Sequence, residues 1–259
     1  MLDFIREHIR VAGDICRRGQ RSLSIDEVDF KESRKDLVTR FDQAVERYLV
    51  ERIGERFPDH DIIGEEEGER LSGSEYCWII DPIDGTTSFC YKQPFYAVSI
   101  GLRRGTEMVA AGIYAPALEQ LFLAERGGGA FLNDERLKVT SCARFDEAVL
   151  ATGFACLRSG LQHNNLVYLV ELLPAIRDIR RCGSAALDLA YVAAGKLDGF
   201  WELNLNLYDI AAGILLVTEA GGTVTDFYGG NAFPARGIVA TNGLIDRQLL
   251  DYTGRYGEP

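Results

Sequence analysis

Long hydrophobic runs, histidines and paired cysteines are scarce in this sequence. No apolar run approaches the ~20 residues that a membrane-spanning helix needs. The three histidines (His8, His60 and His163) fall outside every motif described below, so no Ser–His–Asp arrangement is evident, and we expect each to be a solvated or core residue. Six cysteines are scattered without a Cys-x-x-Cys pair. This argues against a zinc site or a disulfide framework and for reduced, mostly buried thiols in a cytoplasmic protein.

Two further features narrow the class of protein. Residues 1–16 mix charges with apolar residues at helical spacing, which predicts an amphipathic helix and not the uninterrupted apolar core of a signal peptide. The net charge of −11 argues against an extended nucleic-acid-binding surface.

With 47% hydrophobic residues, a chain of 259 residues can bury roughly three-quarters of its unfolded surface. That permits one large domain or two closely packed ones.

The most informative segment, residues 81–89, reads Asp-Pro-Ile-Asp-Gly-Thr-Thr-Ser-Phe. It follows a run of aromatic and branched residues, 76–80, that predicts a buried strand. Pro82 has no N–H to donate, so we expect the hydrogen-bond ladder of this strand to stop there. The carboxylates of Asp81 and Asp84 can then converge on one point around the turn.

The rest of this segment adds a carbonyl and backbone amides. The Ile83 carbonyl lies between the two carboxylates, Gly85 allows the backbone to pass close to a ligand, and residues 86–88 could open a helix. A hard divalent cation shared with a phosphate needs this combination of groups. The alternative is an ordinary surface turn, because Pro, Asp and Gly are the commonest turn residues. The apolar strand before the segment and the helix start within it favour the metal–phosphate interpretation.

Four other acidic residues stand at positions where a strand ends or a helix begins. Glu65 ends the apolar segment 62–64 and starts a run of glutamates that is mostly a solvated loop. Glu202 ends the segment 197–201 in the same way. The remaining two residues lie in the first turn of a predicted helix. For Asp209, capping of the helix is the better interpretation of the residues alone. Asp42 lies three residues after Thr39, a candidate N-cap, and here capping and catalysis are equally supported.

Taken together, these segments resemble the inositol monophosphatase family, the magnesium-dependent, lithium-sensitive sugar phosphatases. The resemblance covers nearly the whole chain, and several motifs in the family's order and spacing make it specific. The motifs are Lys35-Asp36-Leu37-Val38-Thr39, Asp42-Gln43, Ile63-Gly64-Glu65-Glu66, residues 81–89, Gly183-Ser184-Ala185-Ala186-Leu187-Asp188, Trp201-Glu202, Asp209-Ile210-Ala211-Ala212-Gly213 and Glu219-Ala220-Gly221-Gly222.

The resemblance implies two metal positions that share one series of ligands, and a cofactor of two or three magnesium ions per site. The metal that activates the attacking water would be bound by Glu65, the Ile83 carbonyl and Asp81. The metal near the leaving-group oxygens would be bound by Asp81, Asp84 and Asp209. Magnesium lowers the pKa of bound water, and two metals stabilise both the entering and the leaving oxygen of a phosphate ester.

The resemblance also implies how water and substrate are held. Thr86, close to the first metal, and Asp42 would form a hydrogen-bonded pair that orients and deprotonates the water, with Glu65 in the same catalytic set. Lys31 corresponds to a lysine on the family's mobile active-site loop. The implied substrate-binding residues are Gly85, Thr86 and Thr87 for phosphate oxygens, Glu202 for polyol hydroxyls, and Ser184, Ala185 and Asp209 on the same substrate wall.

Two positions depart from the family pattern. Tyr208 stands where the family generally has Trp, and Ser88 where it most often has Asn. Neither change removes a metal ligand. With Tyr208 in place of Trp, however, the family pattern does not predict how the space behind Asp209 is packed. The segment 203–207, which should line the substrate mouth, carries no charge.

The expected function is hydrolysis of myo-inositol monophosphate to inositol and phosphate by a metal-activated water, without a phosphoenzyme. One alternative keeps this chemistry but acts on fructose 1,6-bisphosphate or another small phosphate monoester. Histidinol phosphate and 3′-phosphoadenosine nucleotides are disfavoured, because those relatives often have Lys where this chain has Thr87. A second alternative is a regulatory partner-binding protein that retains a phosphatase site. The family is commonly dimeric, so a homodimer is expected.

Hydrophobic patterns predict an α/β fold with two halves that meet at the active site. In residues 1–145, helices 2–20 and 40–57 are expected to cover an antiparallel sheet. In residues 146–259, strands alternate with helices, among them 161–173, which suggests a second sheet sandwiched by helices. The two halves together fit the family's layered α-β-α-β-α fold, and they may also be counted as one domain.

Overall fold

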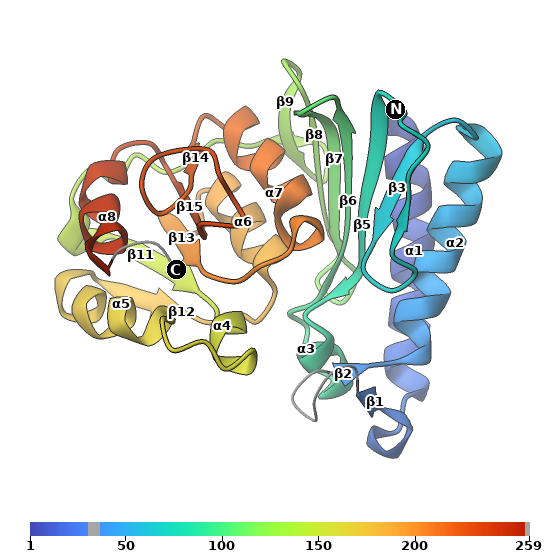
Figure 1. Ribbon diagram of the computed structural model, residues 1–259, viewed down its shortest axis with the longest axis horizontal. Coiled ribbons are helices and arrows are strands. Elements are labelled where there is room, and N and C mark those ends of the chain that lie inside the picture. The colour runs from blue at the N-terminus through green and yellow to red at the C-terminus, as the bar shows by residue number, and fades with distance from the viewer. Residues whose placement is uncertain (31–36, 257–259) are drawn as a thin grey trace.

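The protein consists of five layers in the order α-β-α-β-α, as the family resemblance implied (Figure 1). The computed structural model describes residues 1–30 and 37–256. The α-helices are α1 (Leu2–Ser22), α2 (Arg40–Arg56), α3 (Thr86–Cys90), α4 (Ala155–Arg158), α5 (Asn165–Leu172), α6 (Ala185–Ala193), α7 (Leu207–Glu219) and α8 (Asp246–Thr253). The strands are β1 (Asp29–Phe30), β2 (Leu37–Val38), β3 (Asp61–Gly64), β4 (Glu69–Arg70), β5 (Tyr76–Asp84), β6 (Ala97–Arg104), β7 (Glu107–Ala115), β8 (Gln120–Glu125), β9 (Gly129–Leu132), β10 (Glu135–Arg136), β11 (Val149–Thr152), β12 (Asp178–Arg180), β13 (Gly199–Glu202), β14 (Thr223–Thr225) and β15 (Ile238–Thr241).

The first large sheet brings two acidic residues to the same edge. Its strand order is β10-β9-β8-β7-β6-β5-β3-β4, and the predicted antiparallel meander is present from β6 to β9. The pair β3–β5 is parallel and aligns Gly64 with Ile80. Because parallel strands end at the same edge of a sheet, Glu65 and Asp81 follow these two residues side by side.

The expectation that the ladder of β5 stops at Pro82 was wrong. The strand runs on to Asp84, which pairs with Ala97 of β6, and the register shifts between Asp81 and Asp84. Pro82 lies inside this irregular stretch, where a missing N–H interrupts no regular hydrogen bond. Such irregularities redirect side chains at strand ends, and here the stretch carries both aspartates of the motif.

Helices α1 and α2 cover the outer face of the first sheet (Figure 1). In α1, the side chains of Ile5, Ile9, Ala12 and Cys16 recur every three to four residues and are buried. This spacing places them on one face of the helix, as the sequence predicted. Across the described ranges, no helix combines the length and the apolar character needed to cross a bilayer.

Helices α6 and α7 form the middle layer, and both sheets pack against them (Figure 1). Both helices are apolar on nearly every side, which is typical of helices buried on all faces. One hydrophobic cluster joins Ala111 and Phe122 of the first sheet to Phe200 and Ala240 of the second through these helices. The two halves of the chain therefore share a core.

The second large sheet has the strand order β12-β11-β13-β15-β14, and α4, α5 and α8 lie outside it (Figure 1). The predicted helix 161–173 was wrong at its start. The Asn164 side chain accepts a hydrogen bond from the Leu166 amide at 3.1 Å and caps a helix that begins at Asn165. The short helix α4 before it was not predicted.

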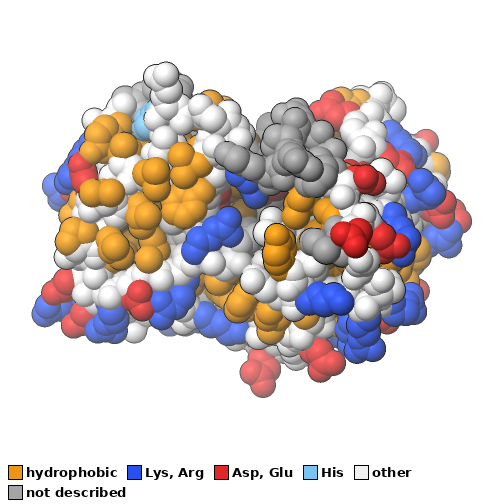
Figure 2. Space-filling view, turned by 90° about the horizontal axis from the view of Figure 1, so that it is seen from below, with side chains coloured by type: hydrophobic (Ala, Val, Ile, Leu, Met, Phe, Trp, Pro, Cys, Tyr) orange, Lys and Arg blue, Asp and Glu red, His pale blue; other side chains and the backbone are white. Residues whose placement is uncertain are grey.

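An apolar stripe runs along the outer face of α5. Leu166, Val170 and Leu173 are 44%, 73% and 49% exposed, and their spacing places them on one side of the helix. With Leu161, which is also exposed, we call this set the α5 stripe. Figure 2 shows hydrophobic side chains gathered on the left-hand lobe, where α5 lies.

Candidate active site

Three aspartates from two elements converge between the sheets. Asp81 and Asp84 come from the irregular end of β5, and Asp209 comes from the first turn of α7. One carboxylate oxygen of each lies within 4.8 Å of the others. Asp209 also accepts a hydrogen bond from the Asn206 amide at 2.5 Å, so the capping role that its position suggested is present as well.

Burial makes these carboxylates hard to ionise in the absence of a cation. It raises the pKa of Asp81 and of Asp209 well above the usual range, and the nearby charges of Glu65 and Asp84, respectively, raise them further. Burial also raises the pKa of Asp84, to about 6. Two hydrogen bonds to Asp84 Oδ2, from Ser184 Oγ at 2.6 Å and the Ala186 amide at 2.7 Å, oppose this rise.

The donor set fits a divalent cation. Asp81 Oδ1 is buried and has no hydrogen-bond partner among the described residues. An unsatisfied carboxylate oxygen in such a place is costly, and a cation would satisfy it. All the candidate side-chain ligands are carboxylates, which magnesium and calcium prefer.

The turn after β5 brings backbone amides next to the carboxylates. Gly85 has a φ of +93° and precedes α3, and a Cβ at this position would lie 2.8 Å from the Phe95 carbonyl oxygen. Only glycine fits both constraints. Thr86 and Thr87 follow in the first turn of α3, where amides have no partner within the helix.

Asp42 caps α2, as its sequence position suggested, and its second carboxylate oxygen lies near Thr86. Its Oδ2 accepts hydrogen bonds from the Thr39 amide at 2.8 Å and the Thr39 hydroxyl at 2.6 Å, which completes a capping box on α2. Its Oδ1 lies 3.5 Å from Thr86 Oγ1, which is 3.1 Å from the Ile83 carbonyl oxygen. Burial raises the pKa of Asp42 to about 7. A carboxyl group with a pKa near neutrality suits proton transfer.

Glu65 follows β3, and the loop that it begins is hydrogen-bonded to the buried carboxylate of Glu46. Glu46 of α2 accepts hydrogen bonds from the Glu66 amide at 2.9 Å and the Glu67 amide at 2.6 Å. A Cβ on Gly64 would lie 2.2 Å from Glu46 Oε1, so a side chain at this position would displace the Glu46 carboxylate. The sequence analysis did not identify Glu46.

The predicted substrate wall lies across the site from β5. Ser184 is the N-cap of α6 and Ala185 its first residue, so the hydroxyl that caps α6 also donates to Asp84. Glu202 ends β13, and its Oε1 accepts a hydrogen bond from the Ala155 amide at 3.0 Å. Burial raises the pKa of Glu202 to about 7.

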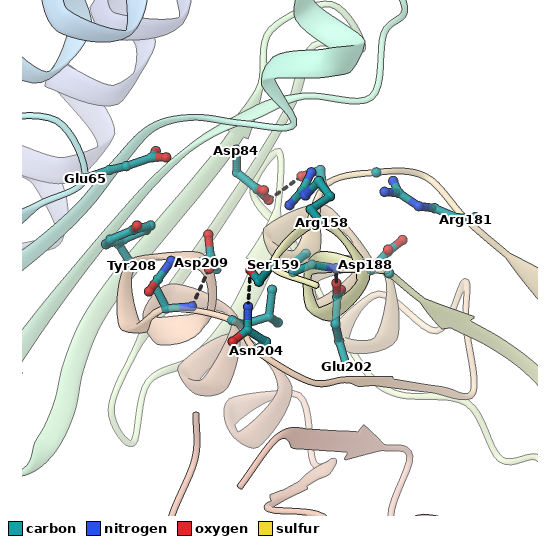
Figure 3. A pocket seen from close by; sticks show the side chains of 17 residues that line it. Glu65, Asp84, Arg158, Ser159, Arg181, Asp188, Glu202, Asn204, Tyr208 and Asp209 are labelled. Atoms are coloured by element: carbon teal, nitrogen blue, oxygen red, sulfur yellow. Dashed lines mark hydrogen bonds between the residues drawn. The ribbon is translucent and has the colours of Figure 1, made fainter. Parts of the chain in front are cut away.

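Two adjoining cavities lie between β5 and the substrate wall, with volumes of about 630 and 410 Å³. Six residues line both cavities: Glu65, Asp84, Arg158, Arg181, Gly183 and Asp209. Figure 3 shows Glu65, Tyr208 and Asp209 on one side of the larger cavity, and Arg158, Arg181 and Glu202 on the other. The segment 203–207 contributes Asn204, Leu205 and Asn206 to the mouth, as expected.

Sequence reasoning missed the two arginines. Arg181 lies two residues before the Gly183-Ser184 motif, and this position could have indicated it. Arg158 lies at the end of a helix that was not predicted, so no signal pointed to it.

Lys31, the predicted mobile-loop residue, lies outside the described residues. Tyr208 packs against Cys77, Ile79 and Ala211, so the position behind Asp209 is filled. None of the histidines lines either cavity, and each contacts an aromatic side chain instead: His8 with Tyr48, His60 with Trp78 and His163 with Tyr168.

Comparison with known proteins gave matches along nearly the whole chain. The profile of the inositol monophosphatase family matches residues 1–257. An inositol-1-monophosphatase of Mesorhizobium japonicum is 44% identical over 217 residues, which is 83% of this chain and 82% of that protein. The Nus factor SuhB of Escherichia coli is 41% identical over 253 residues, 96% of this chain and 94% of that protein. The crystal structure of the extragenic suppressor protein suhB of Bartonella henselae superposes with a TM-score of 0.91 at 38% identity, covering 98% of each chain.

Proposed function

The chain belongs to the inositol monophosphatase family, whose members are phosphoric monoester hydrolases, and we propose that it hydrolyses myo-inositol monophosphate with magnesium as cofactor. The observation that carries this proposal is the convergence of Asp81, Asp84 and Asp209 beside the first turn of α3. The unsatisfied Asp81 oxygen supports a cation among these carboxylates. The amides of Thr86 and Thr87 are suitably placed for phosphate oxygens.

The ligands proposed for two or three magnesium ions are Glu65, Asp81, the Ile83 carbonyl, Asp84 and Asp209. Bound magnesium would lower the pKa of water and neutralise charge on the phosphoryl group. The ligands would be supported by groups that fix their orientation, as Ser184 and the Ala186 amide do for Asp84. Such supporting contacts orient ligands in metal sites generally.

The protein's own groups would then move the proton and hold the substrate. The Thr86 hydroxyl orients the attacking water, and its neighbour Asp42 accepts the proton that water loses. The water oxygen bonds to phosphorus as the ester bond breaks, and inositol leaves with a proton from solvent. Gly85, Thr86 and Thr87 hold phosphate oxygens through their amides. Ser184, Ala185 and Glu202 face the polyol.

The test is phosphate release from a panel of phosphate monoesters, with and without magnesium, including inositol 1-phosphate and fructose 1,6-bisphosphate. We expect magnesium-dependent release, with inositol 1-phosphate among the substrates. Release from another ester alone would retain the chemistry and change the substrate. No release from any ester in the presence of magnesium would refute the proposal.

A second candidate function, binding to a regulatory partner, is favoured by the names of two relatives. One is called a Nus factor and the other an extragenic suppressor protein, and both cover nearly the whole of this chain. We propose to test it by complementation of an E. coli strain that lacks its SuhB protein. Rescue by both the wild type and the Asp84→Asn variant would support a role separate from hydrolysis, and absence of rescue would argue against it.

We also propose that the α5 stripe is the contact surface of a homodimer. Exposed apolar patches of this kind mark interaction sites in soluble proteins. In a two-fold dimer the same patch of each copy faces its equivalent, so the stripe of one protomer would cover that of the other.

A further inference from the structure

Arg158 and Arg181 are the basic side chains that line the two cavities within the described residues. Neither guanidinium lies within 4.0 Å of a carboxylate oxygen in the part of the chain that the structure describes. Several carboxylates line the same cavities, yet none of those described forms an ion pair with these arginines. Two cations therefore stand in the substrate space with their charge available to a ligand.

The guanidinium of Arg181 lies against the turn before α6. A Cβ on Gly183 would lie 2.4 Å from Arg181 Nη1, so the guanidinium occupies the space that a side chain at position 183 would fill. Gly183 has a φ of +96°, a conformation that glycine adopts without strain. The side chain thus extends across the backbone next to Ser184, into the space that the two cavities share.

Arg158 faces the same space from the opposite element. It is the last residue of α4 and lines both cavities, as Arg181 does. The positive charges of both arginines act on the same buried carboxyl, Glu202, and lower its pKa against the larger opposing effect of burial. In Figure 3 the two side chains lie on the side of the cavity away from Glu65 and Asp209.

Inositol monophosphate has no need of these arginines. Its single phosphate is accounted for by the α3 amides and the carboxylate-bound cations of the proposed function, and its neutral hydroxyls suit Glu202 and Asn204. A guanidinium is instead the side chain best matched to phosphate and carboxylate, because its planar N–H groups can bind two oxygens at once.

We propose that Arg158 and Arg181 form a second anion-binding subsite, which accepts a further phosphate or carboxylate of the substrate. Phosphate monoesters that carry such a group should be hydrolysed with a higher kcat/KM than inositol 1-phosphate. The inference rests on the proposed phosphatase function. It extends the substrate class from monophosphates of uncharged polyols to phosphate monoesters that carry a second anionic group.

The experiment compares kcat/KM for fructose 1,6-bisphosphate and inositol 1-phosphate, with saturating magnesium, in Arg158→Gln, Arg181→Gln and the double variant. Arg180→Gln is the matched control, because Arg180 is exposed, pairs with Asp178 at 2.6 Å and lines neither cavity. We expect the double variant to lose about tenfold or more on the bisphosphate, mainly through KM, since charge-assisted hydrogen bonds are lost. Activity on inositol 1-phosphate should change by less than about threefold, because this ester has no second anionic group for the arginines to bind.

Two outcomes would overturn the subsite. Equal losses on both esters would show that the arginines serve the scissile phosphate, and no loss on either would show that they are only solvated. If the wild type hydrolyses neither ester, the proposed function fails, and the same two ligands are then titrated by calorimetry. Arginine-dependent preference for the bisphosphate in that titration would support the subsite, and its absence would overturn it.

Discussion

Asp84 illustrates how one side chain can be both a structural partner and a proposed ligand. Its Oδ2 joins the end of β5 to the start of α6 through Ser184 and the Ala186 amide. Its charge raises the pKa of Asp81 and of Asp209. The residue therefore stabilises the fold by hydrogen bonding and destabilises the metal-free site by repulsion.

Replacing Asp84 with Asn should separate these two effects. The amide oxygen can still accept the two hydrogen bonds, while the negative charge that a cation needs is lost. We expect magnesium-dependent turnover to fall by roughly 100-fold or more, and the melting temperature of the metal-free protein to rise by about 2–4 °C for each ~1 kcal/mol of repulsion removed. Phosphatase assays and thermal unfolding in a chelator measure the two effects. Retained activity would refute the metal assignment.

The raised carboxyl pKa values predict how the metal-free protein responds to pH. The folded pKa of Asp84 is about 6, above its ordinary 3.8. Its contribution to folding stability is therefore fully present below the unfolded pKa and is lost as the pH rises through about 6. The cost at pH 8 is on the order of 2–3 kcal/mol from this group alone.

We therefore expect urea unfolding in a chelator to give a lower free energy of unfolding at pH 8 than at pH 5. Magnesium should stabilise the protein more at pH 8, because ligands must be deprotonated to bind it. The Asp84→Asn variant should show a flatter pH profile without metal. A wild-type profile that rises from pH 5 to pH 8 in chelator would contradict this account.

At the scale of elements, the loop after β3 is positioned by α2, a helix on the outer face of the first sheet. Glu46 of α2 holds the amides of Glu66 and Glu67, and this fixes the direction in which Glu65 leaves β3. Glu46 has no exposed surface and touches no substrate cavity. It is thus a positioning residue for the proposed ligand Glu65.

Glu46→Gln should weaken magnesium binding more than it affects the fold. The amide can accept one of the two N–H groups but presents its own N–H₂ to the other. We expect the magnesium concentration for half-maximal activity to rise about 10- to 100-fold, with activity recovering at high magnesium. Glu51→Gln, at an exposed position of the same helix, is the control. An unchanged magnesium requirement would contradict the positioning role.

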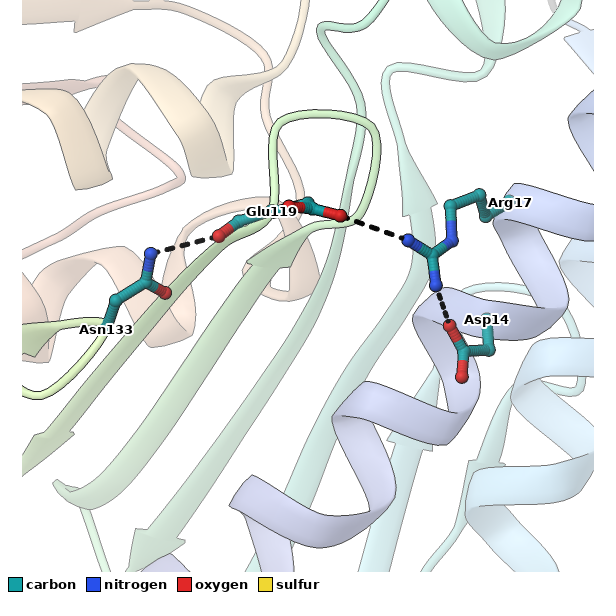
Figure 4. Close-up of polar contacts among 4 residues, drawn as sticks. All are labelled: Asp14, Arg17, Glu119 and Asn133. Carbon is teal, nitrogen blue, oxygen red and sulfur yellow. Dashed lines mark hydrogen bonds and ion pairs between the residues drawn. The ribbon is translucent and has the colours of Figure 1, made fainter.

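Element boundaries also show what the sequence could and could not predict. The period of α1 was recognisable because one face of the helix is buried. The β6–β9 meander was recognisable because its strands are short apolar runs separated by turns. Contacts between distant segments leave no local pattern. In Figure 4, Arg17 of α1 pairs with Asp14 of its own helix and with Glu119 of the turn after β7, whose carbonyl accepts from Asn133.

The residues of the candidate site also differ in how far the sequence could indicate them. Asp81 and Asp84 belong to one short motif whose residues alone favour a metal site, whereas Asp209 was assigned as a ligand through the family resemblance. Arg158, Arg181 and Glu46 act through tertiary placement, and only the fold brings them to the site. The continuation of β5 past Pro82 was missed because a proline is tolerated where the ladder is already irregular.

For the whole molecule, the proposed dimer makes a direct prediction about Val170, the most exposed residue of the α5 stripe. Val170→Glu would place a charge against its equivalent across a two-fold axis. We expect the wild type to elute as a dimer in size-exclusion chromatography with light scattering, and the variant as a monomer. Val11→Glu, an exposed apolar position on α1, should remain dimeric. A monomeric wild type would refute the interface.

The layer formed by α6 and α7 has a consequence for synthesis on the ribosome. The first sheet is complete long before α7 emerges, and its inner face, with Ala111 and Phe122, is covered only when α6 and α7 arrive. At roughly 5–20 residues per second, Asp209 follows Asp84 by on the order of ten seconds. During this interval the nascent chain exposes an apolar sheet, and the third aspartate of the cluster is still missing. The order of elements therefore separates the exposure of this apolar face, early in synthesis, from the completion of the aspartate cluster, late in synthesis.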